Sequence, residues 1–311
     1  MRPVQEAPQH GYQLRLMSPL GTYPAKSFLG ASSALVVAPD ICLSIVRLKD
    51  EWKLSGFSEI DCLLPIEIPL LATLTLAVDD GEQYILPYPT HQSMYMSASH
   101  EHALDSAAVT EAADWMRSYI KARKLEEEYV DSIHRPPAAG GIAYYSIPST
   151  DRDAHRRTIL QLLEAADPVT LRGLSSLLKA NMAWEHRELN EAACISLWIS
   201  LDAIHSLVLQ KLRNQGKSNP TSQDASNYVA GAYGVDLPDG SFFEDDYYNR
   251  IRAIHPDNRF GAEARPQFLA DDFYELRHVV IELFHNLVTG MPTKLSSEPG
   301  DRGHAFHLRP L

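Results

Sequence analysis

The first hundred residues alternate between short apolar runs and turn residues. Runs rich in β-branched side chains lie at residues 34–37, 41–46 and 70–78. Asp79-Asp80-Gly81 follows the last run, and residues 84–86 are expected to form the returning strand of a hairpin. The pattern predicts a β-rich domain over residues 1–100, and it leaves the role and the ligand of that domain open.

Beyond residue 100 the apolar positions recur with helical spacing. Residues 101–149 are predicted to hold one helix, over about 106–130, and a linker at 136–141, where two prolines and two glycines interrupt the pattern. A helical bundle is expected over residues 150–290, and a mobile polar tail over 291–311. The predicted fold class is therefore α+β, a β-rich N-terminal region followed by an all-α bundle.

The first two helices of the bundle are expected over about residues 151–166 and from Asp167-Pro168 to about residue 180. Asp167 is a good N-cap, and proline suits the first helical position because its missing N–H is not needed there. A third helix is predicted over about 185–213, and a polar loop follows it to about residue 227.

The third helix has the strongest periodicity in the chain. Apolar residues recur in it at steps of three and four, at Ala193, Leu197, Leu201, Ile204, Val208 and Leu212. The helix is nearly apolar all round, which is typical of a buried central helix or a subunit interface. Two polar groups interrupt it. Asp202 is expected to be a buried carboxylate that needs an arginine partner, and His205 is expected to be a satisfied polar group.

The last helix is predicted to begin at Asp272, which with Glu275 resembles a capping box, and to end at Gly290. Its apolar residues form a single stripe, made by Phe273, Leu276, Val280, Leu283 and Leu287. The helix is therefore expected to be amphipathic.

Composition limits the kinds of protein that this chain resembles. No apolar run approaches the ~20 residues that span a bilayer, and the N-terminus lacks an apolar signal core. The three cysteines are far apart and form no CxxC pair, which favours reduced thiols in a cytosol and predicts neither a metal site nor a cofactor. The net charge of −12 counts against broad, nonspecific binding of nucleic acid, but not against a local basic pocket.

Arg250 and His255 are the candidate chemical pair, in the run Tyr-Tyr-Asn-Arg-Ile-Arg-Ala-Ile-His-Pro over residues 247–256. An arginine is a permanent cation that forks onto phosphate oxygens, and a histidine exchanges a proton near neutral pH. Together they suit phosphodiester chemistry that uses no metal. The simpler alternative is that the local arginines form ion pairs with Glu244, Asp245, Asp246 and Asp257.

The order of these features resembles the HEPN domain, and closest the ApeA-like HEPN group. The resemblance rests on the helix segment Leu-Trp-Ile-Ser-Leu-Asp-Ala-Ile over residues 197–204, on the tyrosine-preceded Arg-x4-His, and on the closing amphipathic helix. It covers roughly residues 150–290, and it implies an all-α bundle. Many active members of this family are metal-independent endoribonucleases that work as homodimers and need no cofactor.

The resemblance implies a role for each matching residue. His255 would exchange the proton in the cleavage step, Arg250 would hold the scissile phosphate, and Asp202 would orient or charge-balance that arginine. Asn249 would supply a polar contact beside the arginine. The RNA itself would be contacted by Arg252, Arg259 and Tyr248, although packing inside the bundle is the alternative for the tyrosine.

These roles describe a cytosolic RNase that leaves 2′,3′-cyclic phosphate ends, in bacterial defence or a toxin-like system, with a trigger bound at the N-terminal region. One residue departs from the pattern. Ile251 follows the motif arginine, where active members commonly carry a polar residue. Together with the acidic charge, it favours the alternative of a non-catalytic HEPN-like module for dimerisation or nucleotide binding.

Overall fold

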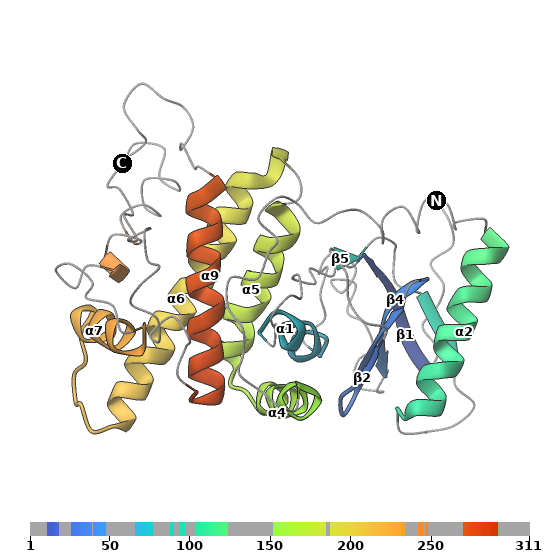
Figure 1. Cartoon of the computed structure of the whole chain (residues 1–311), viewed down its shortest axis with the longest axis horizontal. Helices are drawn as coiled ribbons and strands as arrows, with labels where there is room; N and C mark the ends of the chain where they lie inside the picture. The colour runs from blue at the N-terminus through green and yellow to red at the C-terminus, as the bar shows by residue number, and fades with distance from the viewer. Residues whose placement is uncertain are drawn as a thin grey trace. The chain divides into compact units, whose positions relative to one another are not determined.

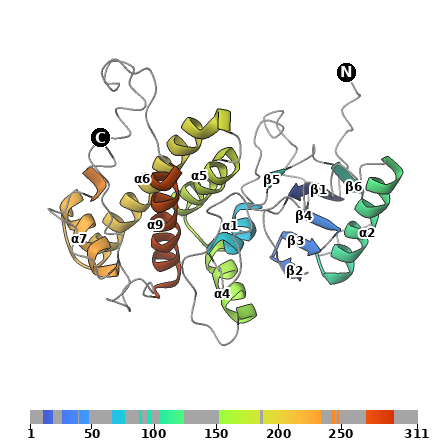
Figure 2. The same ribbon diagram turned by 45° about the horizontal axis from the view of Figure 1, so that its top comes forward.

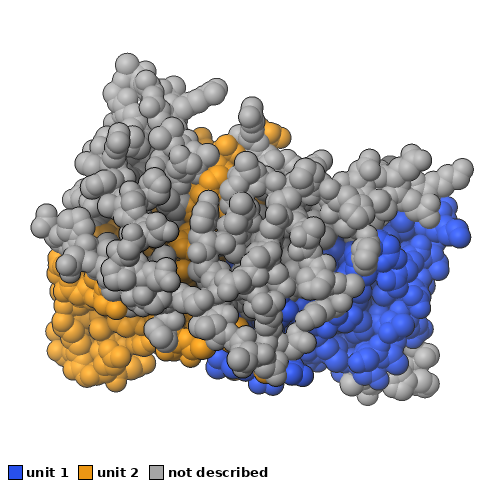
Figure 3. Space-filling model, viewed as in Figure 1, with its two compact units in different colours: residues 1–143, 156–164 blue, residues 144–155, 165–311 orange. Residues whose placement is uncertain are grey.

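The structure is a computed structural model of the 311-residue chain. It describes residues 11–18, 26–38, 40–47, 66–76, 88–89, 94–97, 104–123, 152–184, 187–233, 242–244, 247 and 270–291. The chain divides into two compact units, coloured separately in Figure 3. Unit 1 comprises residues 1–143 and 156–164, and unit 2 comprises residues 144–155 and 165–311. The described part is mixed: an antiparallel sheet near the N-terminus, and mostly helices elsewhere.

This division differs from the expected one at two helices. The helix α2 (Ser106–Arg123) belongs to unit 1 and packs on the sheet, instead of standing in a separate segment. The helix α4 (Arg152–Glu164) is divided, with residues up to 155 assigned to unit 2 and the remainder to unit 1. The predicted linker at 136–141 and the tail from residue 292 lie outside the described residues.

Unit 1 is built on an antiparallel sheet with the strand order β2-β3-β4-β1. These strands are β1 (Gly11–Ser18), β2 (Lys26–Leu29), β3 (Ser33–Ala38) and β4 (Ile41–Arg47). The short β5 (Tyr88–Pro89) and β6 (Met94–Ser97) also pair with β1. The predicted strands at residues 34–37 and 41–46 are confirmed as β3 and β4. The predicted hairpin strand at 84–86 lies outside the described residues.

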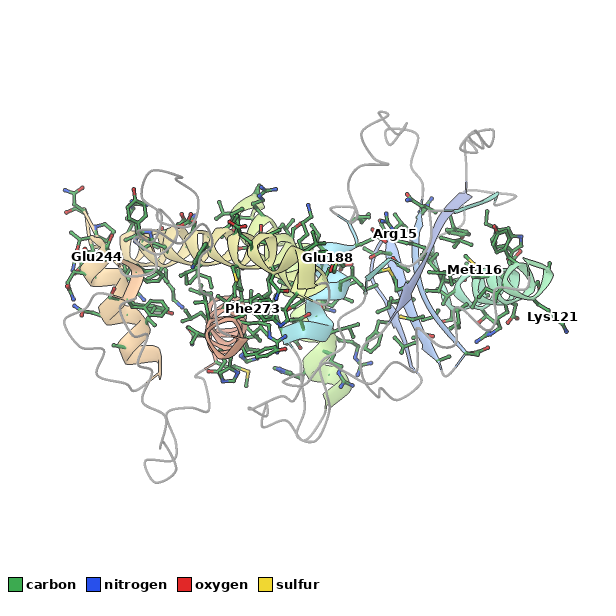
Figure 4. All side chains as sticks on the ribbon, turned by 90° about the horizontal axis from the view of Figure 1, so that it is seen from above. Arg15, Met116, Lys121, Glu188, Glu244 and Phe273 are labelled. Carbon is green, nitrogen blue, oxygen red and sulfur yellow. The ribbon has the colours of Figure 1, made fainter. Side chains whose placement is uncertain are left out.

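The sheet has a helix on each face (Figure 2). Leu14 pairs with Ile45, and these residues join Met116 of α2 in one apolar core. Arg15 pairs with Ser44, so these two residues point to the opposite face because side chains alternate along a strand. On that face Glu67 accepts a hydrogen bond from Ser44 Oγ at 2.6 Å and lies 3.4 Å from the Arg15 guanidinium. Figure 4 shows Arg15 and Met116 on the two sides.

The residues expected to form a strand at 70–78 begin in a helix, α1 (Ile68–Leu76). All nine residues of α1 are buried, so the run has no amphipathic period that would distinguish a strand from a buried helix. Pro69 fits the first turn of a helix. Thr73 Oγ1 donates to the carbonyl of Pro69 at 2.8 Å. This bond to the carbonyl four residues earlier satisfies the buried hydroxyl within the helix. The strand prediction for this segment was therefore wrong.

Unit 2 is described as helices. Besides the first turn of α4, they are α5 (Pro168–Trp184), the short 3-10 turn η2 (Arg187–Leu189), α6 (Asn190–Asn214), α7 (Ser222–Tyr233) and α9 (Ala270–Thr289). In Figure 1, α5, α6 and α9 lie side by side. By length and composition α6 is apolar enough to cross a membrane, but half of its most apolar window is buried within the protein. A core helix meets the same criterion.

Helix ends were predicted with mixed success. Asp167 Oδ1 accepts hydrogen bonds from the backbone N–H groups of Val169 and Thr170, which confirms the predicted cap of α5. Gly290 ends α9 in the left-handed conformation, with φ +71°, as predicted. Asp272 lies inside α9, not at its start, because the helix already begins at Ala270.

The polar segment after α6 was predicted as a loop to about residue 227, but it contains the start of α7. The backbone N–H of Asp224 donates to Thr221 Oγ1, and that of Thr221 donates to the Asp224 carboxylate. This reciprocal arrangement is a capping box with an aspartate in the acidic position. The segment is polar in composition, yet its local capping favours a helix start.

Gly173 lies at a point of close approach between α5, α6 and α9. A Cβ added to it would lie 2.5 Å from Phe284 Cζ of α9 and 2.6 Å from Ala203 Cβ of α6. Ser200 Oγ donates to the Gly173 carbonyl at 2.9 Å. At the other end of α5, the Trp184 ring stacks on Phe273 with centroids 3.9 Å apart. Helix α5 therefore contacts α6 and α9 through a glycine at one end and aromatic rings at the other.

We expect Gly173→Ala to destabilise unit 2 by about 1–3 kcal/mol, because the added methyl overfills a packed three-helix junction. The matched control is Gly231→Ala in α7, where nothing lies within 4 Å of the added Cβ. That variant should be stabilised by about 0.5–1 kcal/mol through the helix propensity of alanine. Urea unfolding followed by far-UV circular dichroism measures both. Equal effects of the two changes would contradict the close packing at Gly173.

Candidate functional site

Most of the predicted site lies outside the described residues. This holds for the catalytic candidates Arg250, His255 and Asn249, and for the RNA-binding candidates Arg252, Arg259 and Tyr248. The exception is Asp202, in the middle of α6. The structure therefore gives the scaffold on which the Arg-x4-His segment is carried: α6 and α7 precede that segment in the chain, and α9 follows it.

Asp202 is exposed, and the expectation of a buried carboxylate was wrong. Leu201 and Ala203 on either side of it are buried, so the outward face of α6 passes through position 202. Sequence periodicity missed this because the helix looked apolar all round. The backbone carbonyl of Asp202 accepts a hydrogen bond from Ser206 Oγ at 3.0 Å. An exposed carboxylate suits contact with an arginine or a ligand without the desolvation cost of a buried one.

His205 lies one turn after Asp202 and is half-buried. Its Nε2 atom is buried without a hydrogen-bond partner, so the expectation of a satisfied histidine was wrong. The ring packs on Phe243 with centroids 4.8 Å apart at 46°. Burial lowers the pKa of His205 from its ordinary value, which favours the neutral imidazole. Phe243 belongs to the short helical turn 242–244, seven residues before Arg250, so this contact ties α6 to the chain that leads into the motif.

A second cluster of titratable groups lies on α9, where the sequence predicted only an apolar stripe. His278, Glu282 and His285 are spaced four and three residues apart, so they share one face of the helix. Their exposed fractions are 8%, 1% and 5%. His278 Nε2 lies 3.3 Å from Glu282 Oε1, and His285 Nε2 lies 3.4 Å from His155 Nε2 of α4. We call His278, Glu282 and His285 the α9 polar stripe.

Burial controls the protonation of the α9 polar stripe. It raises the pKa of Glu282 to about 8, and it lowers the pKa of His278 to about 4, with a smaller contribution from the neighbouring Arg277. The pKa of His285 falls to about 4 through burial and then through His155. The contact between His278 and Glu282 is within ion-pairing distance, but neither Glu282 oxygen has an aligned hydrogen bond. Loss of solvation therefore outweighs the short contact, and both groups are neutral near pH 7.

The sequence carried a signal for the α9 polar stripe that periodicity analysis of apolar residues passed over. Two histidines and a glutamate at spacing i, i+4, i+7 mark one face as clearly as leucines do. The sequence predicted an amphipathic helix with one apolar stripe. In the structure, residues 277–286 of α9 are buried all round, so the helix is central to unit 2 instead of amphipathic at its surface.

No group of three histidine, cysteine, aspartate or glutamate side chains among the described residues is arranged to hold a metal ion. Cys42 and Cys194 are not joined in a disulfide, and both are buried. Burial raises the pKa of the Cys42 thiol to about 12, so it remains a thiol. Cys62 lies outside the described residues.

No family model matches the chain, and searches among curated proteins and solved structures likewise found no match.

Asp202→Asn should change the free energy of unfolding by no more than about 0.5 kcal/mol, because the carboxylate is exposed. A buried carboxylate would instead change it by several kcal/mol. The control on the same helix is Ser200→Ala, which removes the buried hydrogen bond to Gly173 and should cost about 1 kcal/mol. Thermal unfolding of the three proteins side by side gives the comparison. A large loss in Asp202→Asn would show that the side chain supports the fold.

Proposed function

We propose that this chain is a metal-independent endoribonuclease of the HEPN type, with Arg250 and His255 as its catalytic residues. One observation carries the proposal: an arginine and a histidine five positions apart follow a long bundle helix with an outward-facing aspartate, and precede a second long helix packed on the first. The exposure of Asp202 supports the proposal, since an exposed carboxylate can be approached by an arginine side chain at little desolvation cost.

The chemistry needs only these side chains. His255 takes the proton from a ribose 2′-hydroxyl, the 2′-oxygen attacks the adjacent phosphorus, and the bond from phosphorus to the 5′-oxygen breaks. A proton delivered to the leaving oxygen gives a 5′-hydroxyl, and the other product ends in a 2′,3′-cyclic phosphate. Arg250 stabilises the negative charge that develops on the phosphoryl oxygens.

The remaining candidates assist this pair. Asp202 balances the charge of Arg250 and fixes its direction, while Asn249 supplies the polar contact that Ile251 does not. Arg252 and Arg259 contact the RNA backbone, and Tyr248 stacks on a base. With a net charge of −12 on the chain, RNA binding depends on this local basic segment and not on a broad basic surface.

The proposal extends to assembly and context. Two copies pair through the helical bundle and bring their motifs into one cleft, in the cytoplasm, as part of a bacterial defence or toxin-like system. Unit 1 holds the ligand or trigger that controls cleavage.

The second candidate is a non-catalytic dimerisation or nucleotide-binding module. Two observations favour it: Ile251 stands where active members of the family carry a polar residue, and half of the apolar window of α6 is not buried within the chain. In this case Arg250 holds a phosphate without cleavage, and α6 pairs two copies.

We expect the purified chain to cleave total RNA in the presence of a chelator, because the proton transfer and charge stabilisation come from side chains. His255→Ala should lower the rate about 10²–10⁴-fold, as expected for loss of a proton-transfer group. Arg250→Ala should reduce it severely, and Asp202→Asn less so. The measurement is cleavage rate on a labelled RNA, with end analysis for cyclic phosphate.

The matched control for loss of positive charge is Arg213→Ala, at the exposed end of α6. It should cleave as the unchanged protein does. Equal cleavage by all variants would indicate a contaminant and contradict the proposal. A dimer in sedimentation without any cleavage would favour the non-catalytic module.

A further inference from the structure

The α9 polar stripe is costly for a core helix. A buried carboxyl and two buried imidazoles lose solvation, and the described contacts compensate for little of it. Apolar residues of similar size would pack here at no such cost. Buried polar groups with so little compensation occur mainly at functional sites.

Among the described residues, titratable groups near the α9 polar stripe come from α9 itself, from α4 and from α7. On α9 itself Arg277 is adjacent, with its guanidinium 4.8 Å from the Tyr274 ring centre. From α4 the titratable group is His155, and from α7 it is Tyr228, whose hydroxyl donates to Asn286 Oδ1 at 2.8 Å. At the junction with α5 and α6, Phe284 packs against Gly173 beside Ala203, and none of these residues titrates. An anion at position 282 would form its ion pair with His278, whose Nε2 atom lies 3.3 Å from Glu282 Oε1.

The short distance makes His278 and Glu282 one titrating unit. Because their nearest atoms are 3.3 Å apart, the two groups titrate as a coupled pair. Between the pH at which His278 loses its proton and the pH at which Glu282 loses its proton, the pair holds one proton in total. Within the pair the proton moves between the Glu282 oxygen and His278 Nε2, without a change in net charge.

We propose that the α9 polar stripe is a proton-operated latch: the single proton held by His278 and Glu282 keeps α9 packed in unit 2, and its loss loosens the helix. Losing that proton leaves a carboxylate and a neutral imidazole inside the bundle. The released proton goes to solvent base. The latch does not depend on the proposed ribonuclease activity.

The contact between His285 and His155 extends the latch to acid conditions. Two neutral imidazoles whose Nε2 atoms face each other at 3.4 Å need one N–H and one lone pair between them. The pair tolerates one extra proton, which can reside on an Nδ1 atom. A second extra proton places an N–H on both facing atoms and separates the rings. Acid should therefore release the first turn of α4 from α9.

The Glu282 carboxyl and the two histidines, His278 and His285, change stability in opposite directions as pH rises. The pKa of Glu282 is raised to about 8 in the folded chain, so its stabilising effect is complete below the ordinary value near 4.5 and is lost as pH rises to 8. The pKa values of His278 and His285 fall to about 4, so their stabilising effect is complete above 6.5 and is lost as pH falls to 4. Unit 2 should therefore be weakened toward both extremes.

Hydrogen exchange of the full chain between pH 5 and pH 9 tests the latch. After correction for the intrinsic pH dependence of exchange, protection of α9 should fall by up to about tenfold per pH unit as pH rises to 8. Glu282→Gln, which mimics the protonated carboxyl, should remove this decline. The matched control is Glu188→Gln, an exposed glutamate in η2, labelled in Figure 4, which should leave the decline intact.

The acid arm uses His285→Gln and His155→Gln. In each variant, the loss of hydrogen-exchange protection in the first turn of α4 below pH 6 should be reduced. The decline in protection of α9 as pH rises to 8 should be the same as in the unchanged protein. The infrared band of a protonated carboxyl, measured on the unchanged protein, keeps the test valid if a variant does not fold. That band should persist at pH 7 and disappear by pH 9. Its absence above pH 6, or protection of α9 that is independent of pH, would overturn the latch.

Discussion

Unit 2 depends on the absence of a side chain at Gly173. At that position α5 meets Ala203 of α6 and Phe284 of α9 at distances that no Cβ could occupy. The buried bond from Ser200 to the Gly173 carbonyl fixes the level at which α5 and α6 pair. Because the three helices are held at this junction, the outward face of α6 and the buried face of α9 are both determined by it. Exposure of Asp202 and burial of the α9 polar stripe are consequences of one packing arrangement.

The two units bury charge in different ways. In unit 1, Glu67 is set against Arg15 and receives a hydrogen bond from Ser44, so its charge is compensated at the sheet face. In unit 2, Glu282 has one neighbouring imidazole and no aligned hydrogen bond, so the inexpensive response is to keep its proton. A compensated pair contributes a fixed structure, whereas an uncompensated one makes the packing of its helix depend on protons.

Helix α6 links these features to the proposed chemistry. Its buried residues hold the bundle together, Asp202 faces outward, and His205 packs on Phe243 just before the Arg-x4-His segment in sequence. A site that combines residues from a rigid helix with residues from a later segment gains precision from the helix. Phe243 precedes Arg250 by seven residues in the sequence, and α9 follows His255 in the chain.

The sequence by itself determined the features that local chemistry controls: the strands β3 and β4, the cap at Asp167, the glycine end of α9 and the helical periodicity of α6. Predictions from the sequence failed where the decisive contacts are with residues far away in the chain. The run at 70–78 has no period because it is covered on every side, so only packing distinguished the helix α1 from a strand. The exposure of Asp202 and the burial of His278, Glu282 and His285 depend on which neighbours cover each face. Those neighbours come from other parts of the chain, so periodicity along one helix could not reveal them.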